Sequence, residues 1–219
     1  LTLIIPAKNE KDSLPNVLDE LRKFNFKKNI LLEASDKLTI EAIKDYDCNI
    51  IYQDSKGYGD ALKKGIKTVE TEFFCIFNAD GSFDPRELNK MKKKIKLNGY
   101  DFVFASRYEK NCSSEDDTII TKIGNYFFTK LGYLLFNLKI TDILYTFVLG
   151  KTLSAKKLNL NKEDFGFCVE LPIKAKIKNM KISTSKSNER KRYSGKKKVN
   201  AFKDGFLILL AMLSLLKEK

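Results

Sequence analysis

Short apolar runs alternate with stretches of helical spacing through the first half of this 219-residue chain, and that alternation limits the fold more than any other feature. Strands that alternate with helices predict an α/β fold: a Rossmann-like, mostly parallel sheet with helices on both faces. The expected strands cover residues 2–7, 29–34, 48–53, 72–78 and 101–106. One expected helix starts near residue 13, and three others cover residues 39–46, 58–69 and 85–98.

Polar segments follow four of these strands. They read PAKNE at 6–10, SKGYG at 55–59, NADGSFDP at 78–85 and SRY at 106–108. In a parallel sheet these segments lie at one edge, where ligands bind. A glycine-flanked helix start, an acidic cluster and an arginine at one edge suit a nucleotide diphosphate and its metal.

Charge and histidine content narrow the chemistry. Lysine and arginine outnumber the acids 41 to 28, a formal net charge of +13, which favours phosphates, nucleic acid or an acidic lipid surface as partners. The lysines are spread over every expected helix and no nucleic-acid-binding module appears, so we expect no nucleic-acid partner. The chain has no histidine, which excludes Ser-His, Cys-His and histidine-zinc sites.

The second half contains an aromatic-rich helical stretch at 119–138, a polar loop at 111–117, a basic segment at 190–198 and an apolar helix from about 199. The longest uncharged apolar run, 205–216, is shorter than the ~20 residues that span a bilayer. The four cysteines lack C-x-x-C spacing and are expected to be reduced, structural thiols in a cytosolic setting. No secretory signal sequence is expected, because the chain opens directly in a strand-like run.

Taken in order, the segments IIPAKNE, SKGYGDALKKGI, FNADGSFDP, DFVFASRYEK, ITD and RKRYSGKKK resemble the motifs of family 2 glycosyltransferases. The resemblance is to the polyprenyl-phosphate or dolichyl-phosphate sugar transferase branch, and it runs from residue 3 to about 205. It implies an A-type glycosyltransferase fold, a nucleotide-sugar donor, a divalent metal (Mg²⁺ or Mn²⁺) and a lipid-phosphate acceptor. It also implies a cytoplasmic protein, peripheral on the cytoplasmic face of a membrane.

On this basis we expect one glycosyltransferase domain over 1–219, with a nucleotide-sugar-binding half (1–110), an acceptor half (111–198) and a C-terminal apolar helix (199–219). The resemblance implies that Asp80 and Asn78 contact the metal, and that Asp80, Arg107 and Arg192 are catalytic. The implied donor-binding residues are Pro6, Asn9, Glu10, Glu33, Lys56, Gly57, Asn78 and Asp80, and the implied acceptor-binding residues are Arg107, Asp142, Arg192 and Lys198.

The chain departs from the family pattern in three places. Asn78 replaces the first aspartate of the metal motif, Leu32 and Glu33 stand where paired acids are usual, and Lys197 replaces a serine. An amide oxygen can ligate a hard cation but adds no charge, so Asn78 predicts weaker metal binding. Because these acids are altered, the nucleotide base of the donor is undefined. Glu33 or Asp36 is the candidate to replace them in contacting the base or ribose.

Several residues also have structural interpretations. Arg107 either acts on substrate or pairs with Asp101 or Glu109, Asp142 either binds acceptor or orients a neighbouring arginine, and Asp84 is expected to cap the next helix. The basic run KRYSGKKK at 191–198 is either a solvated stretch or a phosphate-binding loop built around Gly195.

Sugar transfer to a lipid phosphate needs no general base, because the acceptor oxygen is already an anion near neutral pH. A histidine-free site therefore allows this reaction. The alternatives are transfer to a glycan hydroxyl in cell-surface polysaccharide synthesis, and a non-catalytic nucleotide-sugar-binding relative. A sugar nucleotidyltransferase would need a glycine-rich, arginine-bearing loop that IIPAKNE lacks. Membrane attachment is expected through the basic 191–198 segment and the apolar stretches 206–216 and 126–136.

Overall fold

The computed structural model describes residues 1–195 and 198–219, and within them the strands form a seven-stranded sheet in the order β3-β2-β1-β4-β6-β5-β7. The five predicted strands are confirmed as β1 (Thr2–Pro6), β2 (Lys27–Leu32), β3 (Asn49–Tyr52), β4 (Phe73–Ile76) and β5 (Phe102–Ser106). Two further strands, β6 (Val148–Lys151) and β7 (Ile182–Lys186), were not predicted. Only β6 runs antiparallel to its neighbours in this described sheet, so the mostly parallel α/β fold is confirmed.

Helices connect most of the strands. The first half contains α1 (Leu14–Leu21), α2 (Lys37–Ala42), α3 (Tyr58–Thr68) and α4 (Glu87–Asn98), and the second contains α5 (Ile119–Phe136), α6 (Thr152–Lys156), α7 (Phe167–Ile177), α8 (Ala201–Leu215) and a final 3₁₀ turn, Leu216–Glu218. The prediction for 39–46 was wrong at both ends, because Asp36 caps the helix by accepting the Thr39 amide and the helix ends at Ala42. The helix expected from Pro85 begins at Glu87. It ends before Gly99, as predicted, and Gly99 adopts a left-handed conformation.

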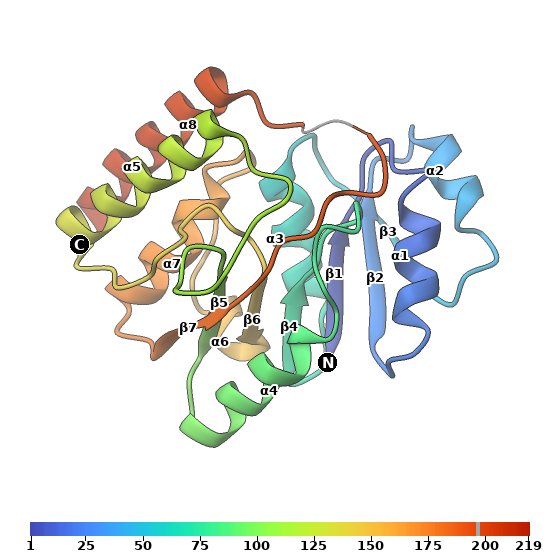
Figure 1. The fold of residues 1–219 in the computed structure, drawn as a ribbon, viewed down its shortest axis with the longest axis horizontal. Helices are drawn as coiled ribbons and strands as arrows, with labels where there is room; N and C mark the ends of the chain where they lie inside the picture. The colour runs from blue at the N-terminus through green and yellow to red at the C-terminus, as the bar shows by residue number, and fades with distance from the viewer. Residues whose placement is uncertain (196–197) are drawn as a thin grey trace.

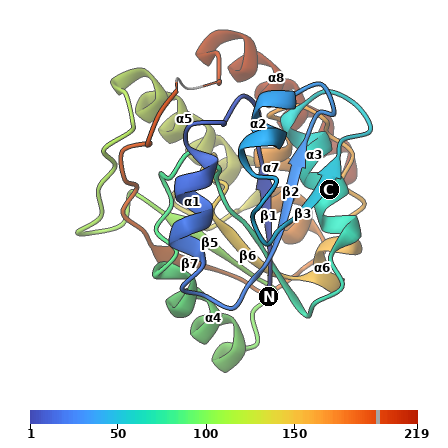
Figure 2. The ribbon, with the colours of Figure 1, turned by 90° about the vertical axis from the view of Figure 1, so that its right-hand side faces the viewer.

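Side chains alternate between the two faces of the sheet and build a hydrophobic core on each. Leu3, Ile5 and Leu32 point into the core under α1 and α4, whereas Ile4 and Leu31 point into the core shared with α3, α7 and α8. Figure 2 shows the sheet between these layers, with α1 on one side and α3 on the other. Covering both faces with helices leaves the carboxyl edge as the exposed end of the parallel strands.

Helices α5 and α8 pack against each other at one side of the molecule (Figure 1). Neither they nor any other helix in the described residues has the length and hydropathy needed to cross a membrane. All four cysteines lie in the described residues and are free thiols, as expected. The residue ranges 1–110 and 111–198 both supply strands to the same sheet.

Between β7 and α8 the chain makes a long excursion. Figure 1 shows this orange-red segment leaving β7, crossing toward the ends of β1 and β4, and returning to the start of α8. Its backbone is hydrogen-bonded to the loop after β4, from Arg190 N to Ser82 O at 2.9 Å and from Tyr193 N to Asp80 O at 2.8 Å. The segment therefore closes over the edge of the sheet where the predicted site residues lie.

Candidate active site

A cavity of about 510 Å³ opens at the carboxyl edge of the sheet. The loops after β1, β3, β4 and β5 line it together, as the sequence predicted. Ten of the predicted site residues lie on its walls: Pro6, Asn9, Glu10, Glu33, Gly57, Asn78, Asp80, Arg107, Arg192 and Lys198. Two predicted residues do not: Lys56 is exposed outside the cavity, and Asp142 is buried behind Arg107.

The loop after β1 is held by the start of α2. Asn9, in a left-handed conformation with φ 52°, donates its backbone N–H to Asp36 Oδ2 at 2.7 Å. Glu10 donates its backbone N–H to Thr39 Oγ1 at 3.0 Å. Asp36 is thus committed to positioning this loop, and of the two predicted substitutes for the missing acid pair only Glu33 faces the cavity, where it pairs with Lys8 at 3.0 Å.

The glycine-rich loop before α3 packs tightly against residues 162–164. A Cβ built on Gly57, whose φ is 137°, would lie 2.1 Å from the carbonyl oxygen of Glu163, so no larger residue fits there. Asp60 fixes the same loop by donating its amide to that carbonyl at 3.1 Å and accepting the Ser55 amide at 3.1 Å. This packing presents Gly57 to the cavity and leaves Lys56 outside it.

Asp80 lies at the end of the loop after β4 and is about nine-tenths buried. Its Oδ1 accepts the Ser82 amide at 3.0 Å, and its Oδ2 lies 3.5 Å from Nη2 of Arg192. Asn78 donates its side-chain amide to Ser82 Oγ at 3.3 Å. Asp84 accepts the Arg86 amide and guanidinium instead of facing the cavity. The prediction that Asp84 caps the next helix was wrong, because Arg86 holds the N-cap position of α4 and, in the described residues, no side chain caps that helix.

No cluster of three or more acidic, cysteine or histidine side chains that could hold a metal occurs in the described part of the chain. Magnesium often binds through one or two carboxylates together with substrate phosphates. The Asp80 carboxylate beside the amide of Asn78 fits a cation that binds together with a diphosphate better than a cation held by protein ligands alone.

Arg107 is the centre of a buried ionic network. Its Nε and Nη2 donate to the two carboxylate oxygens of Asp142 at 2.8 and 2.9 Å, and its Nη1 donates to Glu189 at 3.0 Å. The predicted pairing with Asp101 or Glu109 was wrong, because Asp101 binds Lys151 and Glu109 accepts a hydrogen bond from Thr184. The alternative interpretation of Asp142 is confirmed, since it orients this arginine.

Burial shapes the acidity of this network. Burial raises the pKa of Asp142 and Glu189, and the Arg107 guanidinium opposes that rise in both. Burial lowers the pKa of Arg107 itself, but its hydrogen bond to Asp142 and the neighbouring negative charges outweigh this, so its pKa is raised. The Arg107 guanidinium therefore stays charged, and its hydrogen bonds hold the segments that carry Asp142 and Glu189 together.

Arg192 and Lys198 approach the cavity from the excursion after β7. Arg192 makes a two-point ion pair with Asp116, at 3.0 and 2.7 Å, and Lys198 pairs with Glu10. Lys197, the third departure from the family pattern, lies outside the described residues. Sequence reasoning missed three acidic residues that line the cavity, Asp116, Asp117 and Glu189. The acidic residues of the 111–117 loop are the signal from which the first two could have been found.

Part of the cavity lining is apolar. Tyr58 stacks on Phe165 with ring centroids 5.1 Å apart, and its hydroxyl shares a hydrogen bond of 2.7 Å with Thr146. The apolar lining also includes Leu144, Cys168, Val199 and Ile208. Burial raises the pKa of the Cys168 thiol to about 12, so this cysteine is a neutral wall residue near pH 7. Through Ile208, α8 contributes to this apolar lining.

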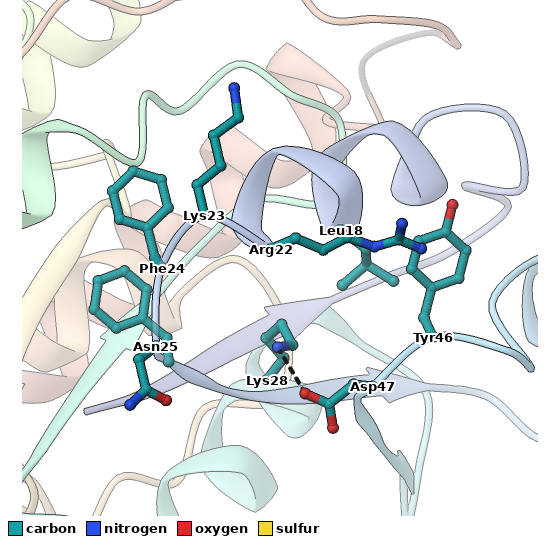
Figure 3. A pocket seen from close by; sticks show the side chains of 9 residues that line it. Leu18, Arg22, Lys23, Phe24, Asn25, Lys28, Tyr46 and Asp47 are labelled. Atoms are coloured by element: carbon teal, nitrogen blue, oxygen red, sulfur yellow. Dashed lines mark hydrogen bonds and ion pairs between the residues drawn. The ribbon is translucent and has the colours of Figure 1, made fainter.

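A second cavity of about 420 Å³ lies between the end of α1 and the start of β2 (Figure 3). Two of its cations have partners, because Lys28 binds Asp47 at 3.3 Å and Arg22 lies over the Tyr46 ring and pairs with Asp19. It sits at the amino end of β2, opposite the predicted site residues. The cavity at the carboxyl edge is therefore the candidate active site.

Comparison with known proteins agrees with this geometry. Residues 2–158 match the family model for glycosyl transferase family 2. An uncharacterized protein of Methanocaldococcus jannaschii is 26% identical over 145 residues, 64% of this chain and 60% of that protein. The UDP-N-acetylglucosamine–dolichyl-phosphate N-acetylglucosaminyltransferase of Methanococcus voltae is 25% identical over 162 residues, 64% of each chain. The chain thus spans less than two thirds of the length of these relatives.

Among solved structures, glucosyl-3-phosphoglycerate synthase from Mycobacterium tuberculosis in complex with Mn²⁺, UDP and glucosyl-3-phosphoglycerate has a TM-score of 0.79 at 12% identity, covering 99% of this chain and 79% of that one. The same enzyme with Mg²⁺ and UDP gives 0.78 at 13% identity, covering 99% and 79%. These likenesses confirm the A-type glycosyltransferase fold. Because the family model covers most of the chain and the fold agrees with it, this chain belongs to glycosyltransferase family 2.

Proposed function

We propose that this chain transfers a sugar from a nucleotide-sugar donor to a polyprenyl or dolichyl phosphate, with a divalent metal, at the cytoplasmic face of a membrane. The observation that carries the proposal is the lining of the cavity, which combines the charged side chains of Asp80, Arg192 and Lys198 with apolar side chains such as Phe165 and Ile208. Such a cavity suits a ligand with a phosphate at one end and a hydrocarbon chain at the other.

The donor half of the proposal rests on the strand-end loops. Asp80, with Asn78 beside it, would hold Mg²⁺ or Mn²⁺, which neutralises charge on the leaving diphosphate. Pro6, Asn9, Glu10, Glu33 and Gly57 line the remaining wall for the nucleotide. The structural neighbours, crystallised with UDP and either Mn²⁺ or Mg²⁺, support a nucleotide-sugar donor.

The acceptor half rests on the cations. A lipid-phosphate oxygen attacks the anomeric carbon, the bond from that carbon to the diphosphate oxygen breaks, and the nucleoside diphosphate leaves with its electron pair. The attacking oxygen is already deprotonated, so alignment and charge neutralisation are what the protein must supply. Arg192 and Lys198 are placed for this task, and Arg107 has five N–H groups of which Asp142 and Glu189 accept three.

The acceptor class is tested by competition. The purified chain is given polyprenyl phosphate and a free oligosaccharide together with a panel of nucleotide sugars, with and without Mn²⁺. We expect a Mn²⁺-dependent product on the lipid phosphate. Transfer only to the oligosaccharide would support the glycan-hydroxyl alternative, and no transfer from any donor would support a non-catalytic role. The dolichyl-phosphate transferase of Methanococcus voltae supports the lipid outcome.

The proposed membrane face lies on α5 and α8. Large apolar side chains on these helices are exposed, including Phe202 at 86% and Phe206 at 61%. Further exposed members are Ile120, Ile123, Tyr126, Phe127, Leu134, Leu210 and Leu213. The basic residues that precede α8 add attraction to anionic lipid, worth about 1 kcal/mol per charge near the surface.

Vesicle sedimentation tests this face. We expect the parent to sediment with anionic more than with neutral vesicles, and the double variant Phe202→Ser/Phe206→Ser to lose most of that binding. Leu97→Ser is the matched control, because Leu97 is 72% exposed on α4, a different helix. Equal binding of the parent to neutral and anionic vesicles would count against membrane docking.

A further inference from the structure

Residues 189–193, here called the strap, run alongside the loop that carries Asp80 (Figure 1). The backbone bonds from Arg190 to Ser82 and from Tyr193 to Asp80 fix the strap to this loop near both ends of the strap. Between these two bonds, the Arg192 side chain reaches Asp116 and comes within 3.5 Å of Asp80. The position of the strap thus sets the position of Arg192.

A single carboxylate on α1 anchors the strap from outside the cavity. Arg190 donates from Nη1 to Glu20 Oε1 at 2.7 Å and from Nη2 to Glu20 Oε2 at 2.9 Å, and the Tyr193 hydroxyl donates to the same Oε2 at 3.3 Å. Two-point arginine–carboxylate pairs fix orientation as well as distance. Glu20 precedes Arg190 by 170 residues, so no local sequence pattern connects them.

The contacts around this anchor are close. Tyr193 lies over Gly81, where a Cβ would approach its ring to 2.3 Å, and Gly81 has φ 86°. Arg190 Nη2 also donates to the Phe83 carbonyl at 2.6 Å, while Arg190 Nε is buried without a hydrogen-bond partner in the described residues. Removing the charge of Glu20 would leave the half-buried Arg190 guanidinium without its carboxylate, which disfavours the docked strap.

We infer that Glu20 is a positioning residue, which acts through Arg190 and Tyr193 to hold Arg192 against the diphosphate region. Glu20 does not line the cavity. The role of Arg192 rests on the proposed function, but the docking of the strap by Glu20 does not.

The test compares Glu20→Gln with Asp19→Asn, the neighbouring α1 carboxylate that pairs with Arg22 at the surface. The first measurement is hydrogen exchange of peptides covering residues 188–195 in the ligand-free protein. We expect the strap amides of Glu20→Gln to exchange at least about tenfold faster, the effect of ~1.4 kcal/mol on a local opening. Asp19→Asn should exchange as the parent does.

The second measurement is affinity for a nucleoside diphosphate with Mn²⁺, using whichever of UDP and GDP the parent binds. We expect Glu20→Gln to bind about tenfold more weakly with an unchanged melting temperature. Arg190→Gln should show the same loss, and the double variant Glu20→Gln/Arg190→Gln should be no worse than either single variant, because the two residues act as one unit.

The inference would be overturned by parent-like strap exchange in Glu20→Gln, by faster exchange with unchanged nucleotide affinity, or by additive losses in the double variant. A lowered melting temperature with parent-like affinity of the folded fraction would also overturn it. None of these measurements uses a lipid acceptor. A failure of lipid-phosphate transfer would therefore leave the anchoring role of Glu20 standing, and the two proposals fail separately.

Discussion

The two sides of the candidate active site are built in different ways. The side formed by the loops after β1 to β4 is held by hydrogen bonds to the loop backbone, such as the Asp80 carboxylate accepting the amide two residues later and the Asn9 amide donating to Asp36. The opposite side is assembled from distant segments, since Arg107 joins Asp142 and Glu189, which lie 35 and 82 residues away. The first side is a set of strand-end loops, and the second is a network of buried charges.

Mutations on the two sides of the site should differ in their effect on stability. A residue on the strand-end side can be removed with local consequences, because the strand behind it stays paired in the sheet. A residue of the buried network leaves unpaired charges behind it, which costs far more than an exposed ion pair contributes. Function and stability should therefore separate between the two sides, and the following variants test that separation.

The largest effect is expected at Asp80. Asp80→Ala should abolish Mn²⁺-dependent binding of nucleoside diphosphate, because it removes the carboxylate that we propose holds the metal, and calorimetric titration measures the loss. Asp84→Ala is the control, since Asp84 binds Arg86 and lies outside the cavity. If Asp80→Ala binds nucleotide and Mn²⁺ as the parent does, the metal site lies elsewhere.

The next effect is on stability. Arg107→Ala should lower the free energy of unfolding by about 3–5 kcal/mol, because it leaves the buried carboxylates of Asp142 and Glu189 uncompensated. Arg192→Ala, whose ion pairs are partly exposed, should lower it by about 1 kcal/mol or less. Urea unfolding followed by circular dichroism compares the two, and equal midpoints would contradict the distinction.

A smaller effect is expected from Arg192→Lys. Lysine keeps the charge but loses the planar fork that aligns a phosphate, so the rate of transfer should fall about tenfold while binding of the lipid phosphate changes less. Lys198→Arg serves as the control, because it keeps the charge and adds a fork. A loss of binding as large as the loss of rate would assign Arg192 to attraction alone.

The smallest effect is expected at Lys56. The family resemblance assigns Lys56 to the donor, yet its side chain is exposed outside the cavity, so Lys56→Ala should change donor affinity by no more than about twofold. Glu33→Gln, on the cavity wall, should weaken donor binding more. A loss above tenfold for Lys56→Ala would mean that the loop before α3 moves onto the bound donor.

The strand-end side was predictable because its information is local. Apolar runs, the glycines before α3 and the acidic turn after β4 each specify a structure within about ten residues, and sheet topology then gathers them at one edge. The errors there were at element ends, as at α2, where Asp36 caps the helix earlier than its apolar spacing indicated.

The opposite side was not predictable for a physical reason. The partner of a buried charge is chosen by packing, not by spacing along the chain, so the sequence offered Asp101 and Glu109 for Arg107 where the structure provides Asp142 and Glu189. The antiparallel β6 has the same origin, because its four residues acquire their place only between β4 and β5.

The sequence by itself determined the alternating architecture, the family, and the cavity position of Asp80 and Gly57, since each depends on residues near in the chain. Only the tertiary structure decided that Arg107 is committed to buried carboxylates, that Lys56 lies outside the cavity, and that Glu20 anchors the strap. These contacts join segments up to 170 residues apart. Their energies depend on desolvation in the folded protein, and no local pattern in the chain encodes that.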